Sequence, residues 1–201
     1  MSSSVPRRLL GAALLIGTGL GVGAVPAWAQ DGVSIEIGGL LRTGLRIESE
    51  ETGHNDGFQI FDAQATLGGQ VGVVFDYFLR AAFDTEDNTL KLLDAVVRHS
   101  FIPEAGVGFG MFRPSFGLEA LEDEGDFTFL RRSQASVAIA PGRQIGAEFF
   151  GEALETRLTY GAGIFNGNGR TLENDNNQFM VAARAQYNSV GPVELYSDLV
   201  I

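Results

Sequence analysis

The sequence predicts an all-β protein, an antiparallel transmembrane β-barrel of about eight or nine strands. Three observations predict this fold: apolar and polar residues alternate in segments of about ten residues, arginine lies on the polar side of most segments, and the connections alternate between short and long. A soluble β-sandwich would show the same alternation, so it is the alternative fold.

Residues 1–29 have the composition of a secretory signal. Arg7 and Arg8 precede the apolar run LLGAALLIGTGLGVGAV, and Ala27-Trp28-Ala29 supplies the small residues that a signal peptidase needs. The expected organisation is therefore a signal peptide over 1–29 and one β-barrel domain over 30–201. Without the signal the chain has 12 basic and 25 acidic residues, a net charge of −13, which disfavours nucleic acid as a partner.

The alternation is clearest in SIEIGGLLRTGLRIE, where apolar residues at odd positions from 35 to 47 alternate with Glu36, Arg42 and Arg46. This period of two residues is that of a strand with one apolar face. The same pattern recurs and predicts strands near 33–48, 58–71, 76–84, 90–101, 105–113, 143–150, 156–166 and 178–188, with a ninth that begins at Pro192.

The basic residues and the connections favour the barrel over the sandwich. After the signal the chain has 11 arginines and a single lysine, Lys91, although lysine would serve equally well on the outside of a soluble sheet. Arginine facing lipid would cost roughly 2 to 4 kcal/mol at the bilayer midplane, so the arginines are expected to face inward. Short turns at one end and longer loops at the other are typical of outer-membrane barrels.

An ordered series of short motifs resembles the phosphate-selective porin O and P family. The motifs are DAVVRHSFIPEAGVGFGMFRPSFGLEAL, FLRRS, PGRQIGAEFFG and LTYGAGIFNG. The positions that match the family pattern are Asp94, Arg98, Pro103, Gly110, Phe112, Phe116, Gly117, Glu119, Phe129, Arg132, Ser133, Gly142, Arg143, Gly146, Tyr160, Phe165, Asn166 and Gly167. The chain departs from the pattern at Met111, Arg113 and Arg131.

The resemblance implies a water-filled diffusion channel for anions, phosphate or polyphosphate, in the outer membrane of a Gram-negative bacterium. It implies a sixteen-stranded, homotrimeric porin surrounded by outer-membrane lipid, of which this chain would be the N-terminal half, incomplete at the C-terminus. Porins of this kind fold one loop into the lumen, so residues 114–142 are expected to form a constriction. No cofactor is expected.

Arginine suits phosphate because its planar guanidinium donates two parallel hydrogen bonds. The expected pore-lining residues are Arg42, Arg46, Arg80, Arg98, Arg113, Arg131, Arg132 and Arg184. The expected acids of the constriction loop are Glu119, Glu122, Asp123, Glu124 and Asp126, which could hold the loop against wall arginines. As an alternative, the wall arginines pair across the lumen and only fill space, their partners being Glu36, Asp62, Asp76, Asp94 and Glu148.

Other chemistry has little support in the sequence. The two histidines, His54 and His99, are isolated and there is no cysteine, so no metal site is expected. No serine has a histidine at a recognisable motif spacing, so we expect no enzyme activity. The alternative function is that of a small eight-stranded barrel with a plugged lumen, which would act as a structural anchor or a surface binding module.

Overall fold

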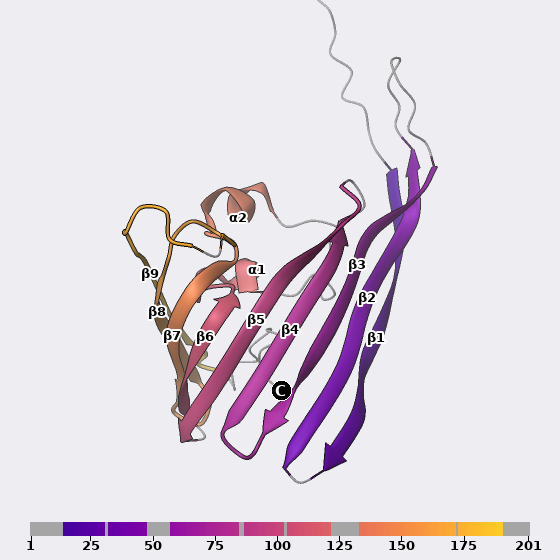
Figure 1. Cartoon of the computed structure of the whole chain (residues 1–201). Coiled ribbons are helices and arrows are strands. Elements are labelled where there is room, and N and C mark those ends of the chain that lie inside the picture. The colour runs from indigo at the N-terminus through magenta and orange to yellow at the C-terminus, as the bar shows by residue number, and fades with distance from the viewer. Residues whose placement is uncertain are drawn as a thin grey trace, which may run out of the picture.

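The computed structural model describes residues 14–30, 32–47, 57–84, 87–102, 104–121, 133–171 and 173–190, with only the backbone described for 14–30, 46 and 47. The nine strands of this part of the chain are β1 Leu14–Gln30, β2 Val33–Ile47, β3 Gly57–Val71, β4 Phe75–Asp84, β5 Thr89–Ile102, β6 Ala105–Phe112, β7 Gln144–Ala153, β8 Leu158–Phe165 and β9 Met180–Tyr187. Two short helices, α1 Leu118–Leu121 and α2 Gln134–Ile139, lie between β6 and β7 (Figure 1).

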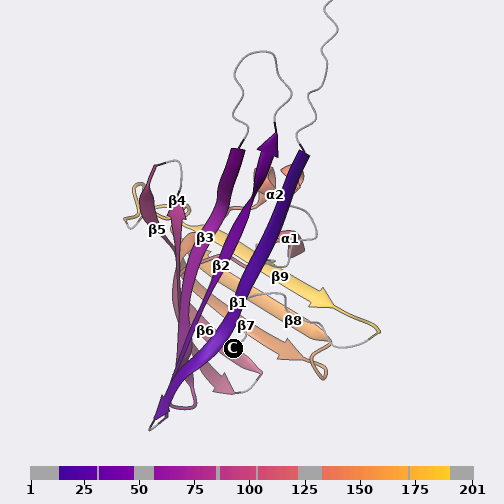
Figure 2. The same cartoon turned by 90° about the vertical axis from the view of Figure 1, so that its right-hand side faces the viewer.

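The strands form one antiparallel sheet in sequence order, from β1 to β9. The sheet is strongly curved, so that β1–β3 and β7–β9 face each other across its concave side (Figure 2). Within the described residues β1 and β9 do not pair with each other, and the sheet is open. The predicted all-β fold is confirmed, and each of the eight strands expected between 33 and 188 is present with small shifts at its ends. The ninth expected strand, from Pro192, lies outside the described residues.

Strand β1 differs from the expectation for the N-terminus, because residues 14–29 of the expected signal, together with Gln30, pair along β2. The pairing runs from Leu14 opposite Ile47 to Gln30 opposite Val33. An apolar segment rich in glycine can satisfy the N–H and C=O groups of an edge strand, whatever its role in export. The predicted cleavage site after Ala29 lies beside the β1–β2 turn, so cleavage would leave β2 as the first strand. The signal peptide itself stays a prediction.

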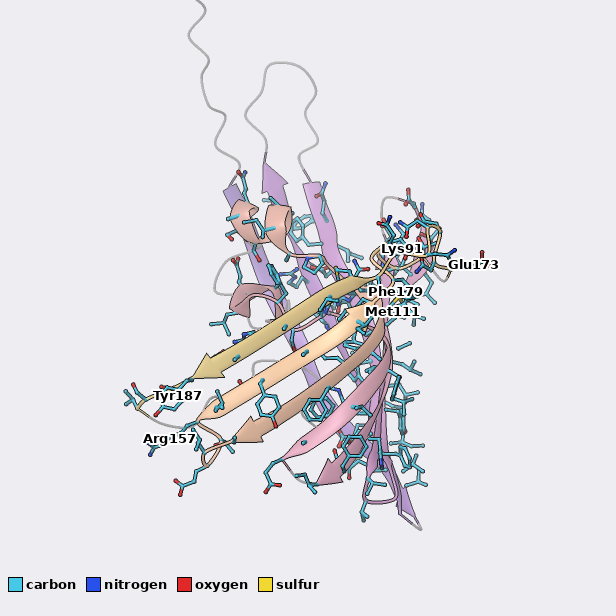
Figure 3. The ribbon with its side chains drawn as sticks, turned by 90° about the vertical axis from the view of Figure 1, so that its left-hand side faces the viewer. Lys91, Met111, Arg157, Glu173, Phe179 and Tyr187 are labelled. Carbon is cyan, nitrogen blue, oxygen red and sulfur yellow. The ribbon has the colours of Figure 1, made fainter. Side chains whose placement is uncertain are left out.

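The connections divide between the two ends of the sheet as the sequence predicts. One end has the connections 48–56, 85–88, 113–143 and 166–179, and the other has the turns 31–32, 72–74, 103–104 and 154–157. We call these the long-loop end and the short-turn end. Figure 3 shows Lys91 and Glu173 at the long-loop end and Arg157 and Tyr187 at the opposite one.

The two faces of the sheet differ sharply in chemistry, because strand alternation separates the side chains. The outer, convex face is apolar and exposed; it includes Ile37, Leu41, Leu79, Phe83, Leu90, Val97, Phe109, Phe149, Ile164 and Val181. Aromatic residues gather near the short-turn end of this face, where the His99 ring stacks on Phe75 at 4.6 Å. An exposed apolar face of this extent fits contact with lipid.

The inner, concave face carries most of the buried polar side chains of the described chain, among them Arg80, Asp94, Gln144 and Glu148. It also has an apolar cluster that the alternation does not predict. Val96, Phe112, Phe165 and Ala182 form this cluster, with Phe78 and Met180 packed against it. Thus the inner wall combines a packed apolar patch with a charged band. Among the described residues no helix is long and apolar enough to cross a membrane.

Gly110 provides a test of the pairing between β5 and β6. Its φ is +135°, and a Cβ atom there would overlap the carbonyl oxygen of Ala95 and lie 3.0 Å from the Cα of Val96. We expect Gly110→Ala to destabilise the folded protein by about 1 to 3 kcal/mol, since both the backbone conformation and the close approach require glycine. Urea unfolding measures this change. Gly57→Ala is the matched control, because nothing lies within 4 Å of the added carbon; equal losses in the two variants would contradict the pairing.

Candidate ion pathway on the concave face

Four of the predicted pore-lining arginines lie on the concave face. The registers place Arg42 opposite Asp62, Arg80 opposite Asp94, Arg98 opposite Gly108 and Arg184 opposite Gly161. These positions share one face of the sheet, because paired residues of adjacent antiparallel strands project to the same side. The concave face therefore presents guanidinium groups on β2, β4, β5 and β9.

Arg42 is held by an ion pair within the sheet. Its Nε donates to Asp62 Oδ2 at 2.7 Å, and its Nη2 contacts the same oxygen. The pairing register shifts directly after this pair, between Arg42 and Thr43, so Phe61 is an extra residue in β3. A bulge of this kind redirects side chains near it, and here the bulge lies beside the ion pair.

Asp94 joins two arginines from different parts of the chain. Arg143, which precedes β7, donates from Nε to Oδ1 at 2.9 Å and from Nη2 to Oδ2 at 3.1 Å. On the other side, Arg80 Nε lies 3.6 Å from Asp94 Oδ2. The register also shifts next to this pair, between Arg80 and Ala81. Arg80 is 3% exposed and Asp94 is 7% exposed, so this is a buried charge cluster in which two cations share one carboxylate.

The side chain of Arg98 lies along the concave face, over the ring of Phe150 in β7. Its Cζ is 4.7 Å from the centre of the Phe150 ring, an arrangement in which the ring face attracts the cation. Gly108 lies beneath this side chain, and a Cβ there would make an ordinary van der Waals contact with Arg98 Cγ at 3.5 Å. The guanidinium group is therefore oriented across β6 toward β7.

The segment after β6 turns inward and contacts the wall. The backbone N–H of Ser115 donates to Glu148 Oε2 at 2.8 Å, and its hydroxyl donates to Glu148 Oε1 at 2.7 Å. A Cβ at Gly161 of β8 would overlap the Ser115 hydroxyl. Figure 2 shows α1 and α2 on the concave side of the sheet. The wall thus holds this segment through a wall carboxylate, Glu148. The predicted ion pairs between loop carboxylates and wall arginines stay a prediction.

Glu119, the one predicted constriction acid that the structure describes, links the two helices. The Ser133 hydroxyl donates to its Oε2 at 2.6 Å, and the Ser133 N–H donates to its Oε1. Ser133 also caps α2 by accepting from Ser136 N. The other predicted acids, Glu122, Asp123, Glu124 and Asp126, and the arginines Arg131 and Arg132, lie outside the described residues.

The remaining predicted residues are only partly placed. Arg46 lies in β2 opposite Gly57, and its side chain is outside the described part of the structure. Arg113 directly follows β6 and is half-buried. Arg143 and Glu148 were not predicted as pore-lining residues. Arg143 was predicted only as a match to the family motif, and Glu148 only as a wall carboxylate that would pair with an arginine.

Metal chemistry has no site in the described residues, which contain no group of three or more histidine, cysteine, aspartate or glutamate side chains that could hold an ion. His99 lies on the outer face, where its ring meets Phe75 and Phe101, with centroids 5.1 Å apart for the second pair. The polar chemistry of the concave face is therefore that of the arginine and carboxylate groups beside its apolar cluster.

Comparison with known proteins identifies the family. A family model described as phosphate-selective porin O and P matches residues 36–195, which include β3 to β9 and most of β2. No curated protein and no solved structure matches this chain at the threshold applied. Proteins of the matched family are channels of the outer membrane, as the exposed apolar face and the charged inner face suggest. The chain belongs to the phosphate-selective porin O and P family.

Proposed function

We propose that this chain forms the wall of an outer-membrane channel that passes anions, with phosphate or polyphosphate as the preferred ion. The observation that carries the proposal is the single face shared by Arg42, Arg80, Arg98 and Arg184. A guanidinium group has five N–H donors and a carboxylate accepts two of them in a bidentate pair, so a paired arginine can still donate to a passing anion. Several such groups along the wall favour passage over tight capture.

Cations or hydrogen-bond donors must offset the wall carboxylates for anions to be preferred, because carboxylates and arginines stand side by side on this face. Five arginines, including Arg143, stand with Glu36, Asp62, Asp76, Asp94 and Glu148. The structure gives four of these carboxylates a hydrogen-bonding partner: Arg42 for Asp62, Arg143 for Asp94, Gln70 for Asp76 and Ser115 for Glu148. The expected alternative, that arginines pair with wall carboxylates, therefore applies to Arg42 and Arg80 without excluding anion contact.

We further propose that residues 114–142 form the constriction, with Arg131 and Arg132 available to the permeant ion. The inward position of α1 and α2 and the Ser115–Glu148 contact support this. The open sheet would need further strands to satisfy its edges in lipid, as in the sixteen-stranded barrel that the family resemblance implies. Export by the signal at 1–29, assembly as a homotrimer and a Gram-negative outer membrane belong to the same proposal.

Competition between two anions in a planar bilayer tests the phosphate preference. We expect added phosphate to reduce the chloride current of the intact protein, because an ion that is held longer blocks a faster one. We expect Arg98→Ala to need at least about threefold more phosphate for the same block, since one donor group is lost from the wall.

Arg157→Ala is the matched control for the phosphate test, because Arg157 is exposed at the short-turn end. A chloride current that phosphate leaves unchanged would remove the phosphate preference while leaving a channel. No current at all from the intact protein would favour the plugged barrel that serves as an anchor.

A further inference from the structure

We infer that Glu148 is a positioning residue of the channel, which fixes the inward segment after β6 against the wall, and that Gly161 supplies the room in which Ser115 sits. The inference rests on the proposed function, in which this segment begins the constriction. The negative charge of Glu148 alone would weaken an anion pathway. Its role here is instead to hold the segment in place.

The hydrogen bonds of Glu148 show why the carboxylate suits this task. Both of its oxygens accept from Ser115, one from the backbone N–H and one from the hydroxyl. Glu148 is only 5% exposed, and a carboxylate at that depth is costly unless hydrogen bonds compensate for lost water. A contact made by two charge-assisted hydrogen bonds fixes both the position and the direction of the residue that donates them.

Glycine surrounds this contact on the neighbouring strands. Glu148 stands opposite Gly108 of β6 and Gly163 of β8, so no side chain of either paired residue crowds it. At Gly161 an added Cβ would lie 2.8 Å from Ser115 Cβ and 3.2 Å from Glu148 Oε1. The segment therefore packs directly against the backbone of β8 at Gly161. A methyl group at that position would displace Ser115.

Three substitutions separate anchoring from charge. Glu148→Ala removes the charge and both hydrogen bonds, whereas Glu148→Gln removes the same charge but keeps an amide that can accept from Ser115 N–H and donate to the hydroxyl. Gly161→Ala displaces Ser115 without changing any charge. Glu152→Gln, on the same strand, and Gly57→Ala, where nothing lies within 4 Å of the added carbon, are the controls.

Single-channel recording of the intact protein gives the first readout. We expect Glu148→Ala and Gly161→Ala to change the conductance by a factor of about 1.5 or more and to add open-channel noise, because the segment loses its anchor. Glu148→Gln and both controls should stay close to the wild type. Equal changes in Glu148→Ala and Glu148→Gln would mean that the charge alone matters, and would overturn the inference.

Limited chymotrypsin digestion gives a second readout that does not need current. Phe116 directly follows the anchored Ser115 and precedes Gly117, so cleavage after Phe116 reports local opening of this segment. We expect cleavage to be at least about fivefold faster in Glu148→Ala and Gly161→Ala than in the wild type and Glu148→Gln. Unchanged cleavage in the first two variants refutes the anchor whether or not the protein conducts, whereas absence of wild-type current refutes only the proposed channel.

Discussion

Replacement of Asp94 by alanine is expected to destabilise the intact protein by about 3 to 5 kcal/mol, the largest loss among the changes considered. The reason is that Arg143 and Arg80 share this carboxylate at a site where both Arg80 and Asp94 are buried. Removal of the anion leaves two cations close together in a poorly hydrated place, which costs more than the pair contributes when intact. The free energy of unfolding in urea, measured in phospholipid vesicles, checks this.

Asp87→Ala is the control for the Asp94 prediction. Asp87 Oδ2 accepts from Lys91 Nζ at 3.1 Å, but its side chain is 66% exposed. Exposed ion pairs of this kind contribute about 0 to 1 kcal/mol, so Asp87→Ala should be nearly neutral. Similar losses in the two variants would show that Asp94 is not the centre of a buried cluster.

Leu79→Arg is expected to cost about 2 to 4 kcal/mol in vesicles, because Leu79 lies near the middle of β4 on the outer face. The side chain is 40% exposed in the chain alone, so an arginine would not disturb packing within the sheet. Its penalty would come from placing a guanidinium group in hydrocarbon. Urea unfolding of the intact protein in vesicles measures the effect.

Leu90→Arg provides the comparison at a different depth on the same face. Leu90 is 74% exposed and lies at the long-loop end of β5, opposite Phe83. Near the interface the same substitution costs about 0 to 1 kcal/mol. In a soluble sandwich both exposed positions would tolerate arginine to within about 0.5 kcal/mol, so equal and small losses would contradict a lipid-facing surface.

The strands could be predicted from the sequence because their signal is local. Alternation with a period of two needs no knowledge of the partner strand, and it identified every strand from β2 to β9. Alternation also placed Arg42, Arg80, Arg98 and Arg184 on one face, as the registers show. β1 was not predicted as a strand, since the same apolar, glycine-rich composition also describes a secretory signal.

The partners on the concave face could not be predicted, because they depend on register. Two bulges set the pairs Arg42–Asp62 and Arg80–Asp94, and neither bulge has a clear sequence signal. The contact from Arg143 to Asp94 joins residues 49 positions apart. Helices α1 and α2 are too short to show a helical period in the sequence. The apolar cluster around Phe112 and Phe165 was also not predicted, because alternation assigns its positions to the polar face.

The reversal potential of the intact protein in a potassium chloride gradient tests the central claim most directly, because its sign reports which ion carries the current. If the arginines of the concave face and the constriction define the pathway, the potential will have the sign of chloride selectivity. It will move toward zero in Arg98→Ala and will not move in Arg157→Ala. A potential with the sign of potassium selectivity would show instead that the carboxylates govern permeation, and it would contradict the anion channel.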